Sequence, residues 1–176
     1  MELKNLIVML MFLLVVASIT SAGEIIYVDN DARVGGDGST WDTAFKYLQD
    51  GLAAVSYGDE IRVAQGSYIP DQNSANLGGT GIREATFQLI NGVALKGGYA
   101  GAGEPDPNER DVTANETILS GDLAGNDGPD FANNGENSYN VVTGSGRIYT
   151  ITYQAVDDSG NVAVARATVT VPHDQR

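Results

Sequence analysis

The chain has 176 residues, a formal net charge of −13 and no cysteine. Its length gives room for one ordinary domain, or for one domain and a fragment of another. So acidic a surface repels phosphate backbones and anionic lipid, which argues against nucleic acid or a membrane surface as partner. The charge is compatible with divalent cations.

The amino-terminal segment is typical of a cleaved export signal. A lysine precedes the unbroken apolar run 6–16, and Thr20 and Ala22 stand at the −3 and −1 positions of a cleavage site. We expect residues 1–22 to be removed, which gives a mature chain that begins at Gly23, is secreted or held at the cell surface, and does not insert into the membrane. A membrane anchor is the alternative, but the apolar run is shorter than the about 20 residues that span a bilayer.

The mature chain reads as mainly β. Its 22 glycines and its short β-branched runs, each followed by Gly, Asn or Asp, predict short strands and tight turns. Short strands are expected at residues 25–28, 61–64, 86–89, 93–95, 117–119 and 139–142. The glycine-rich and polar segments 70–81 and 101–108 are expected to protrude as loops.

A single amphipathic helix is expected between the first two strands, over residues 43–55. Four apolar residues in this segment have helical spacing, a residue suited to cap the amino end of a helix precedes them, and Gly58 follows them. The apolar residues are Phe45, Leu48, Leu52 and Val55, and the predicted cap is Asp42 or Thr43.

The strands are too short to be stable as isolated hairpins, but they suit a stack of rungs. Ile61, Val93, Thr117 and Tyr139 follow one another at intervals typical of solenoid repeats with inserted loops. These positions predict successive rungs of one parallel stack of three or four coils. An antiparallel sandwich of irregular strands is the competing interpretation.

The run 26–68 resembles the entry region of right-handed parallel β-helix surface proteins of the pectin-lyase-like superfamily. It reads IYVDNDARVGGDGSTWDTAFKYLQDGLAAVSYGDEIRVAQGSY, and the later runs ATFQLINGVALKGGYAG and ETILSGDLAGNDG are similar to the next coils. The resemblance implies a short right-handed parallel β-helix over 23–146, with the helix as an amino-terminal cap. It implies no activity, since lyases, glycosidases and inert surface proteins share this fold.

The carboxyl-terminal segment 147–176 resembles the end of an immunoglobulin-like or hyalin-repeat module. Tyr149, Ile151 and Tyr153 alternate with polar residues, which predicts one strand of a β-hairpin whose second strand lies in 162–171. Such a module needs about seven strands. We therefore expect either a seam near Gly146, left by truncation or internal deletion, or a hairpin that caps the open end of the stack.

The sequence supplies no catalytic, cofactor-binding or metal-binding residue that we would assign. Polar rung positions do not repeat as an acidic pair, as glycosidase chemistry would require; they are Arg62, Gln88, Lys96, Ser120 and Asp122. Arg62 and Lys96 are expected to face solvent and to pair locally. Trp41, Tyr68 and Tyr99 are expected to cover the core edge rather than to stack on sugars.

Calcium is the one cofactor that the pattern raises. Hard oxygen ligands follow at short intervals in GDLAGNDGPD, namely Asp122, Asn126, Asp127 and Asp130. Their spacing fits no EF-hand, and turn formation explains the same residues. The expected function is that of a non-catalytic structural or adhesive surface protein, with polysaccharide or other surface proteins as partners. A carbohydrate-binding or polysaccharide-degrading β-helix remnant is the alternative.

Overall fold

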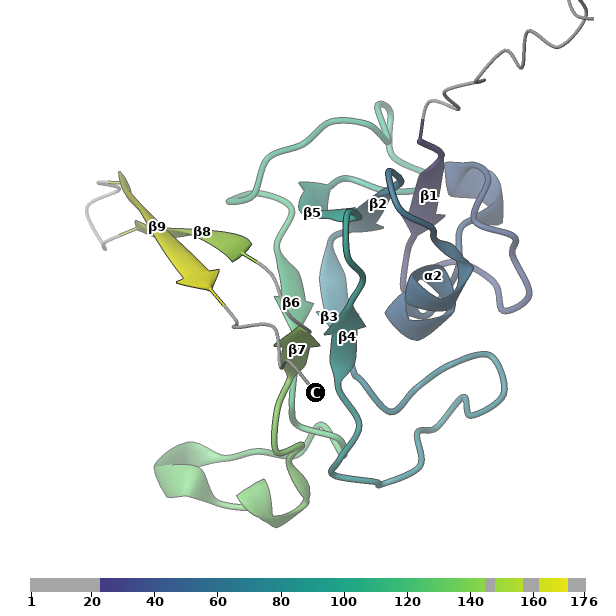
Figure 1. Ribbon diagram of the computed structural model, residues 1–176. Coiled ribbons are helices and arrows are strands. Elements are labelled where there is room, and N and C mark those ends of the chain that lie inside the picture. Colours follow the sequence, from purple (N-terminus) through teal and green to yellow (C-terminus); the bar gives the residue numbers. More distant parts are fainter. Residues whose placement is uncertain (1–22, 145–147, 157–161, 171–176) are drawn as a thin grey trace, which may run out of the picture.

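The computed structural model describes residues 23–144, 148–156 and 162–170. They form a mainly β protein with one short α-helix, α2 (Leu48–Ala54), and several small sheets (Figure 1). The mainly β class expected from the sequence is confirmed. The expected export signal and the junction near Gly146 lie outside the described residues. In the part that is described, no helix has the length and apolar character needed to cross a membrane.

Three small parallel sheets make up the body of the protein. Their strands are β1 (Ile25–Val28), β2 (Glu60–Ala64), β3 (Gly66–Tyr68), β4 (Phe87–Leu89), β5 (Ala94–Tyr99), β6 (Thr117–Leu119) and β7 (Val142–Gly144). One sheet has the order β1-β2-β5, and the other two pair β3 with β6 and β4 with β7. The consecutive strands β2, β3 and β4 therefore each lie beside the strand three places later in the chain.

This pairing corrects the order of rungs expected from the sequence. Thr117 was expected to follow Val93 as the next rung, but Thr117 pairs with Gly66, in a strand that the sequence pattern did not predict. The last strand of this body begins at Val142 rather than at Tyr139. Gly66 allows the chain to turn directly from β2 into β3, because its φ of 132° is a conformation that glycine adopts readily.

The core lies between the sheets and helix α2. Val28, Ile61 and Phe87 are fully buried at the centre of one apolar cluster, and Leu48 and Leu52 of α2 pack into the same cluster. The helix approaches β1 closely, because a Cβ atom on Gly51 would lie 2.7 Å from Val28 Cγ2. Helix α2 therefore packs its apolar residues Leu48 and Leu52 against the sheets, as the sequence predicted for its apolar stripe.

The helix is shorter than its apolar spacing indicated. Phe45 is extended: its N–H donates to the Tyr27 carbonyl at 2.9 Å, and its carbonyl accepts from Asp29 N–H at 2.8 Å. These bonds to β1 replace the helical ones. The predicted caps were wrong for the same reason, since residues Trp41–Thr43 form a separate 3-10 turn, η1, and Thr40 caps that turn instead.

Two longer strands follow the body. Strand β8 (Ile148–Val156) pairs antiparallel with β9 (Val162–Thr170) along its whole length. The antiparallel pair expected at the carboxyl-terminal end is confirmed. Two 3-10 turns, η2 (Pro129–Phe131) and η3 (Asn134–Glu136), lie in the loop between β6 and β7.

Candidate functional site

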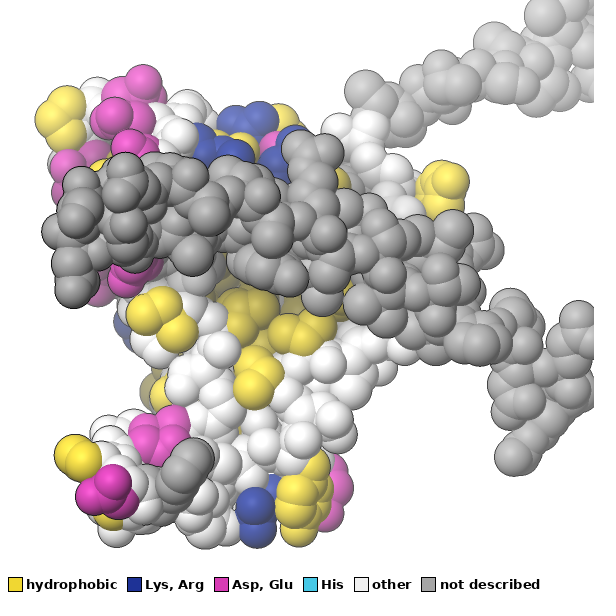
Figure 2. Space-filling model, turned by 90° about the vertical axis from the view of Figure 1, so that its left-hand side faces the viewer, with side chains coloured by type: hydrophobic (Ala, Val, Ile, Leu, Met, Phe, Trp, Pro, Cys, Tyr) yellow, Lys and Arg dark blue, Asp and Glu magenta, His cyan; other side chains and the backbone are white. Residues whose placement is uncertain are grey.

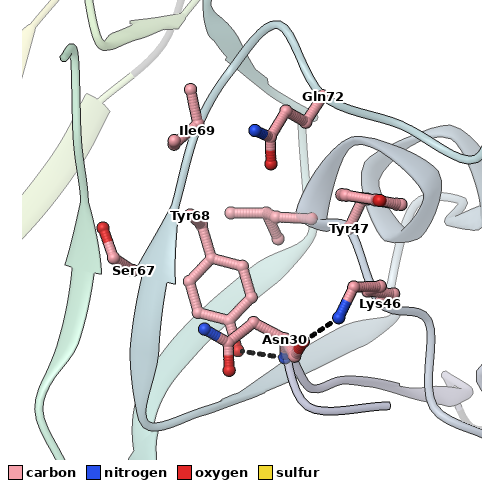
Figure 3. A pocket seen from close by; sticks show the side chains of 8 residues that line it. Asn30, Lys46, Tyr47, Ser67, Tyr68, Ile69 and Gln72 are labelled. Atoms are coloured by element: carbon pink, nitrogen blue, oxygen red, sulfur yellow. Dashed lines mark hydrogen bonds between the residues drawn. The ribbon is translucent and has the colours of Figure 1, made fainter. Parts of the chain in front are cut away.

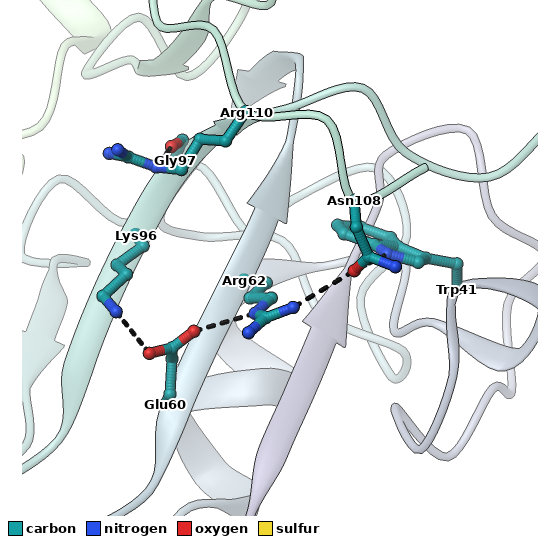
Figure 4. Close-up of polar contacts among 7 residues, drawn as sticks. All are labelled: Trp41, Glu60, Arg62, Lys96, Gly97, Asn108 and Arg110. Carbon is teal, nitrogen blue, oxygen red and sulfur yellow. Dashed lines mark hydrogen bonds and ion pairs between the residues drawn. The ribbon is translucent and has the colours of Figure 1, made fainter. Parts of the chain in front are cut away.

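The outer face of the β1-β2-β5 sheet carries a ladder of charged side chains. The register places Arg62 beside Lys96, and both cations bind Glu60 of the same face (Figure 4). Arg62 Nε donates to Glu60 Oε1 at 2.8 Å, and Lys96 Nζ donates to the other carboxylate oxygen. The local pairing expected for these two cations is confirmed.

The pKa values of the ladder follow from this pairing. Partial burial acts to raise the pKa of Glu60, but the hydrogen bonds from Lys96 and Arg62 outweigh it and hold that pKa below its usual range. The hydrogen bond to Glu60 raises the pKa of Arg62. Glu60 is therefore ionised and Arg62 protonated at neutral pH.

An aromatic layer lies next to this ladder. Trp41 packs edge-on against Tyr27, with ring centroids 4.8 Å apart, and lies 5.8 Å from Tyr99. Trp41 Nε1 and Arg62 Nη1 both donate to Asn108 Oδ1, each at 3.1 Å. Trp41 and Tyr99 are each only 6% exposed, so their ring faces are covered and do not offer a platform for a sugar.

A cleft of about 390 Å³ opens beside β5, on the side away from β2. It is lined by Leu95, Lys96, Gly97, Gly98, Arg110, Val112 and Thr117. Arg110 Nε donates to the Gly97 carbonyl at 2.8 Å, and the guanidinium lies 5.8 Å from the centre of the Tyr99 ring. Within the described part of the chain, the terminal nitrogens of Arg110 make no hydrogen bond. We refer to this hollow, with Lys96 and Arg110 as its cations, as the cationic cleft.

A second pocket, of about 190 Å³, lies between the loop after β1 and the start of α2 (Figure 3). Its polar groups have structural partners. Lys46 Nζ donates to the Asn30 and Ala32 carbonyls. The Tyr68 hydroxyl donates to the Ala64 carbonyl at 3.1 Å and accepts from Asn30 N–H at 3.2 Å, and burial raises its pKa. These contacts fasten the loop to β3.

Three carboxylates meet in the loop after β6. Single oxygens of Asp122, Asp127 and Glu136 all lie within 4.8 Å of one another. The sequence singled out the first two, and it missed Glu136 because η3 brings that residue back from further along the chain. Asp130, the last in the sequence of the four predicted calcium ligands, has a left-handed backbone conformation within η2 and does not belong to this cluster.

The acidic cluster has its own structural role. Asp122 accepts hydrogen bonds from Asp127 N–H at 2.9 Å and Asn126 N–H at 3.1 Å, and these bonds lower its pKa. Asp127 accepts from Asn137 Nδ2 at 2.7 Å. Carboxylate oxygens suit Ca²⁺, but the ion takes six to eight oxygen ligands, and three side chains alone do not supply them.

Two buried carboxylates hold loops in place. Asp29 accepts from Asp31 N–H at 2.9 Å and from Ala102 N–H at 2.8 Å, which ties the loop after β1 to the loop after β5. Asp71 Oδ2 accepts from the N–H groups of Thr80 and Gly81, each at 2.7 Å. Both side chains therefore close loops rather than face a reactant.

Comparisons with protein-family models, with curated proteins and with solved structures gave no match to this chain. The functional argument consequently depends on the arrangement of its own residues.

Proposed function

We propose that the chain is an exported, non-catalytic structural or adhesive surface module built on a short right-handed parallel β-helix. The observation that supports it is the constant offset of the parallel pairs, β2 with β5, β3 with β6 and β4 with β7. A chain that passes three strands before it returns to its starting sheet winds once around the core per coil. Parallel crossovers are right-handed in nearly all proteins, which supports the handedness.

The arrangement of loops supports a display role. The long connections from β3 to β4 and from β5 to β6 leave the stack, and internal carboxylates such as Asp71 and Asp29 fix their shape. Loops on a rigid scaffold are where binding functions are usually found. A non-catalytic role is supported by the charged groups of the sheet face, because two cations neutralise the Glu60 carboxylate and leave it poorly suited to acid or base catalysis.

Binding of an anionic polysaccharide is the second candidate function, and the cationic cleft favours it. Lys96 and Arg110 line one hollow on a chain with a net charge of −13. The terminal guanidinium nitrogens of Arg110, which no described residue binds, suit a carboxylate or sulfate group. A degraded remnant of a polysaccharide-cleaving enzyme would share this cleft. Only cleavage of the polysaccharide would separate that remnant from a binding module.

The test is a binding panel of neutral, carboxylated and sulfated polysaccharides, measured with the purified mature chain with and without calcium. We expect saturable binding to anionic members only, weakened by salt, and no release of shortened products. Replacing Lys96 and Arg110 together by Gln should weaken that binding at least tenfold. Arg33→Gln, which removes a single positive charge from an exposed loop, is the control, and it is compared with Arg110→Gln alone as well as with the double variant. Release of shortened products would refute the non-catalytic proposal. Equal binding by the cleft variant and the Arg33→Gln control would show that the cationic cleft does not bind the polysaccharide.

A further inference from the structure

The last coil of the stack leaves its outer side open. Among residues 23–144, 148–156 and 162–170, no strand pairs with the outer edges of β5, β6 and β7, apart from a single bridge between Tyr99 and Arg110. Unpaired strand edges are templates for association with another strand. An uncovered end of this kind favours association with a second chain.

The open end is also apolar. The register matches three buried residues of the preceding coil with more exposed ones in the last coil: Ile61 with Leu95, Tyr68 with Leu119, and Phe87 with Val142. Phe87 is fully buried, whereas Val142 is 41% exposed. Figure 2 looks onto this end of the stack and shows hydrophobic side chains gathered at its centre. We call this surface the open end.

The antiparallel pair β8–β9 offers a complementary face. Its register pairs Tyr149 with Val169, Ile151 with Ala167 and Tyr153 with Ala165, and these six positions share one face of the two-stranded sheet. The other face begins with Thr150 opposite Thr168 and Thr152 opposite Arg166. One face of the pair is thus apolar in sequence and the other largely polar.

The connection between the two surfaces is short. Strand β7 ends at Gly144 and β8 begins at Ile148, so β8 starts within roughly 15 Å of the last coil, given about 3.6 Å per residue of extended chain. In Figure 1, β8 and β9 lie on the side of β6 and β7 that faces away from α2. Such a tether gives a high effective concentration of one surface at the other.

We propose that the apolar face of β8–β9 covers the open end and closes the stack. The proposal rests on the pairing of β5, β6 and β7 and not on any ligand of the cationic cleft. This contact would stabilise both parts. The β8–β9 pair alone is expected to be only marginally stable in water, and the uncovered last coil would be prone to aggregation. Helix α2 and the β8–β9 pair then close opposite ends of one stack.

The experiment uses the mature chain and its only tryptophan, Trp41, whose fluorescence reports unfolding of the stack and not of β8–β9. Ile151→Asp places a charge on the apolar face of the pair, and Thr152→Asp places the same charge on the opposite face as the matched control. We expect Ile151→Asp to lower the melting temperature seen by Trp41 by roughly 5 °C or more. Thr152→Asp should change it little.

Two further measurements make the result decisive. Methyl NMR of the unaltered chain should show contacts between Ile151 and Leu119, and sedimentation should show a monomer. An unchanged Trp41 transition in Ile151→Asp, together with no such contacts, would establish a seam between independent units and overturn the proposal. A concentration-dependent dimer that protects Leu119 would overturn it in favour of a second copy at the open end.

Discussion

Replacement of Leu48 tests whether helix α2 holds the first coil of the stack. Leu48 is only 1% exposed and belongs to the apolar cluster that contains Val28, Ile61 and Phe87. Truncating a leucine at such a site costs about 2 to 5 kcal/mol, because the transfer energy is lost and a cavity is left. We expect Leu48→Ala to cost about 3 kcal/mol, enough to lower the melting temperature by on the order of 10 °C.

Leu48→Asp should be more damaging, since it also places a carboxylate in an apolar site without a partner. With a total stability of about 5 to 15 kcal/mol, that change should leave much of the protein unfolded at room temperature. The matched control is Ala53→Asp, which adds the same charge on the exposed face of the same helix. Thermal unfolding followed by Trp41 fluorescence measures all three variants. If Leu48→Asp melts within 2 °C or so of the unaltered chain, the helix does not act as a cap.

Three further predictions concern other parts of the chain. Mass spectrometry of exported protein should find an amino terminus at or within a few residues of Gly23, whereas an intact chain in a membrane fraction would contradict the export signal. Glu60→Gln should cost about 1 kcal/mol at neutral pH and nothing near pH 2. Because the pKa of Glu60 is lower in the folded protein, its ion pairs stabilise the fold at pH values above the unfolded-state pKa of about 4.3. This stabilisation is lost as the pH falls through the lower pKa of the folded state. A destabilisation by Glu60→Gln that persists at pH 2 would refute this. Gly79→Ala should destabilise the fold by about 1 to 3 kcal/mol, because φ is +81° and the new Cβ would lie 2.6 Å from Asp71 Oδ2, while Gly78→Ala, which meets nothing within 4 Å, should be nearly neutral.

Short-range patterns in the sequence predicted much of the local structure. Strands β1 and β6 were placed at their observed limits, because each is a compact β-branched or apolar run followed by turn residues. The loops at 70–81 and 101–108 were also placed correctly. Side-chain alternation and turn residues depend on neighbours in the chain, so one sequence is enough to detect them.

The errors came from contacts between distant residues. Phe45 fits the helical spacing, yet its backbone bonds to Tyr27 and Asp29 keep it extended. Strand β3 has three residues and no alternation to detect, and only its pairing with β6 defines it. Glu136 joins Asp122 and Asp127 because two 3-10 turns fold the intervening loop. Partners of this kind depend on the whole fold and leave no local pattern.

The cationic cleft illustrates the same limit. Lys96 was recognised as a surface cation paired nearby, but the sequence did not indicate that Arg110, in a loop, returns to the same hollow. The bulge in β5 and the bond from Arg110 to Gly97 create that proximity.

The most direct test of the stacked architecture is the strand register in solution. Isotope-labelled mature chain should show backbone NOEs for parallel pairing between Arg62 and Lys96, between Ser67 and Ile118, and between Gln88 and Thr143, all in one molecule. We predict that all three sets are present. Antiparallel NOE patterns between these strands, or pairing of β6 with β5 in place of β3, would contradict the proposed parallel β-helix.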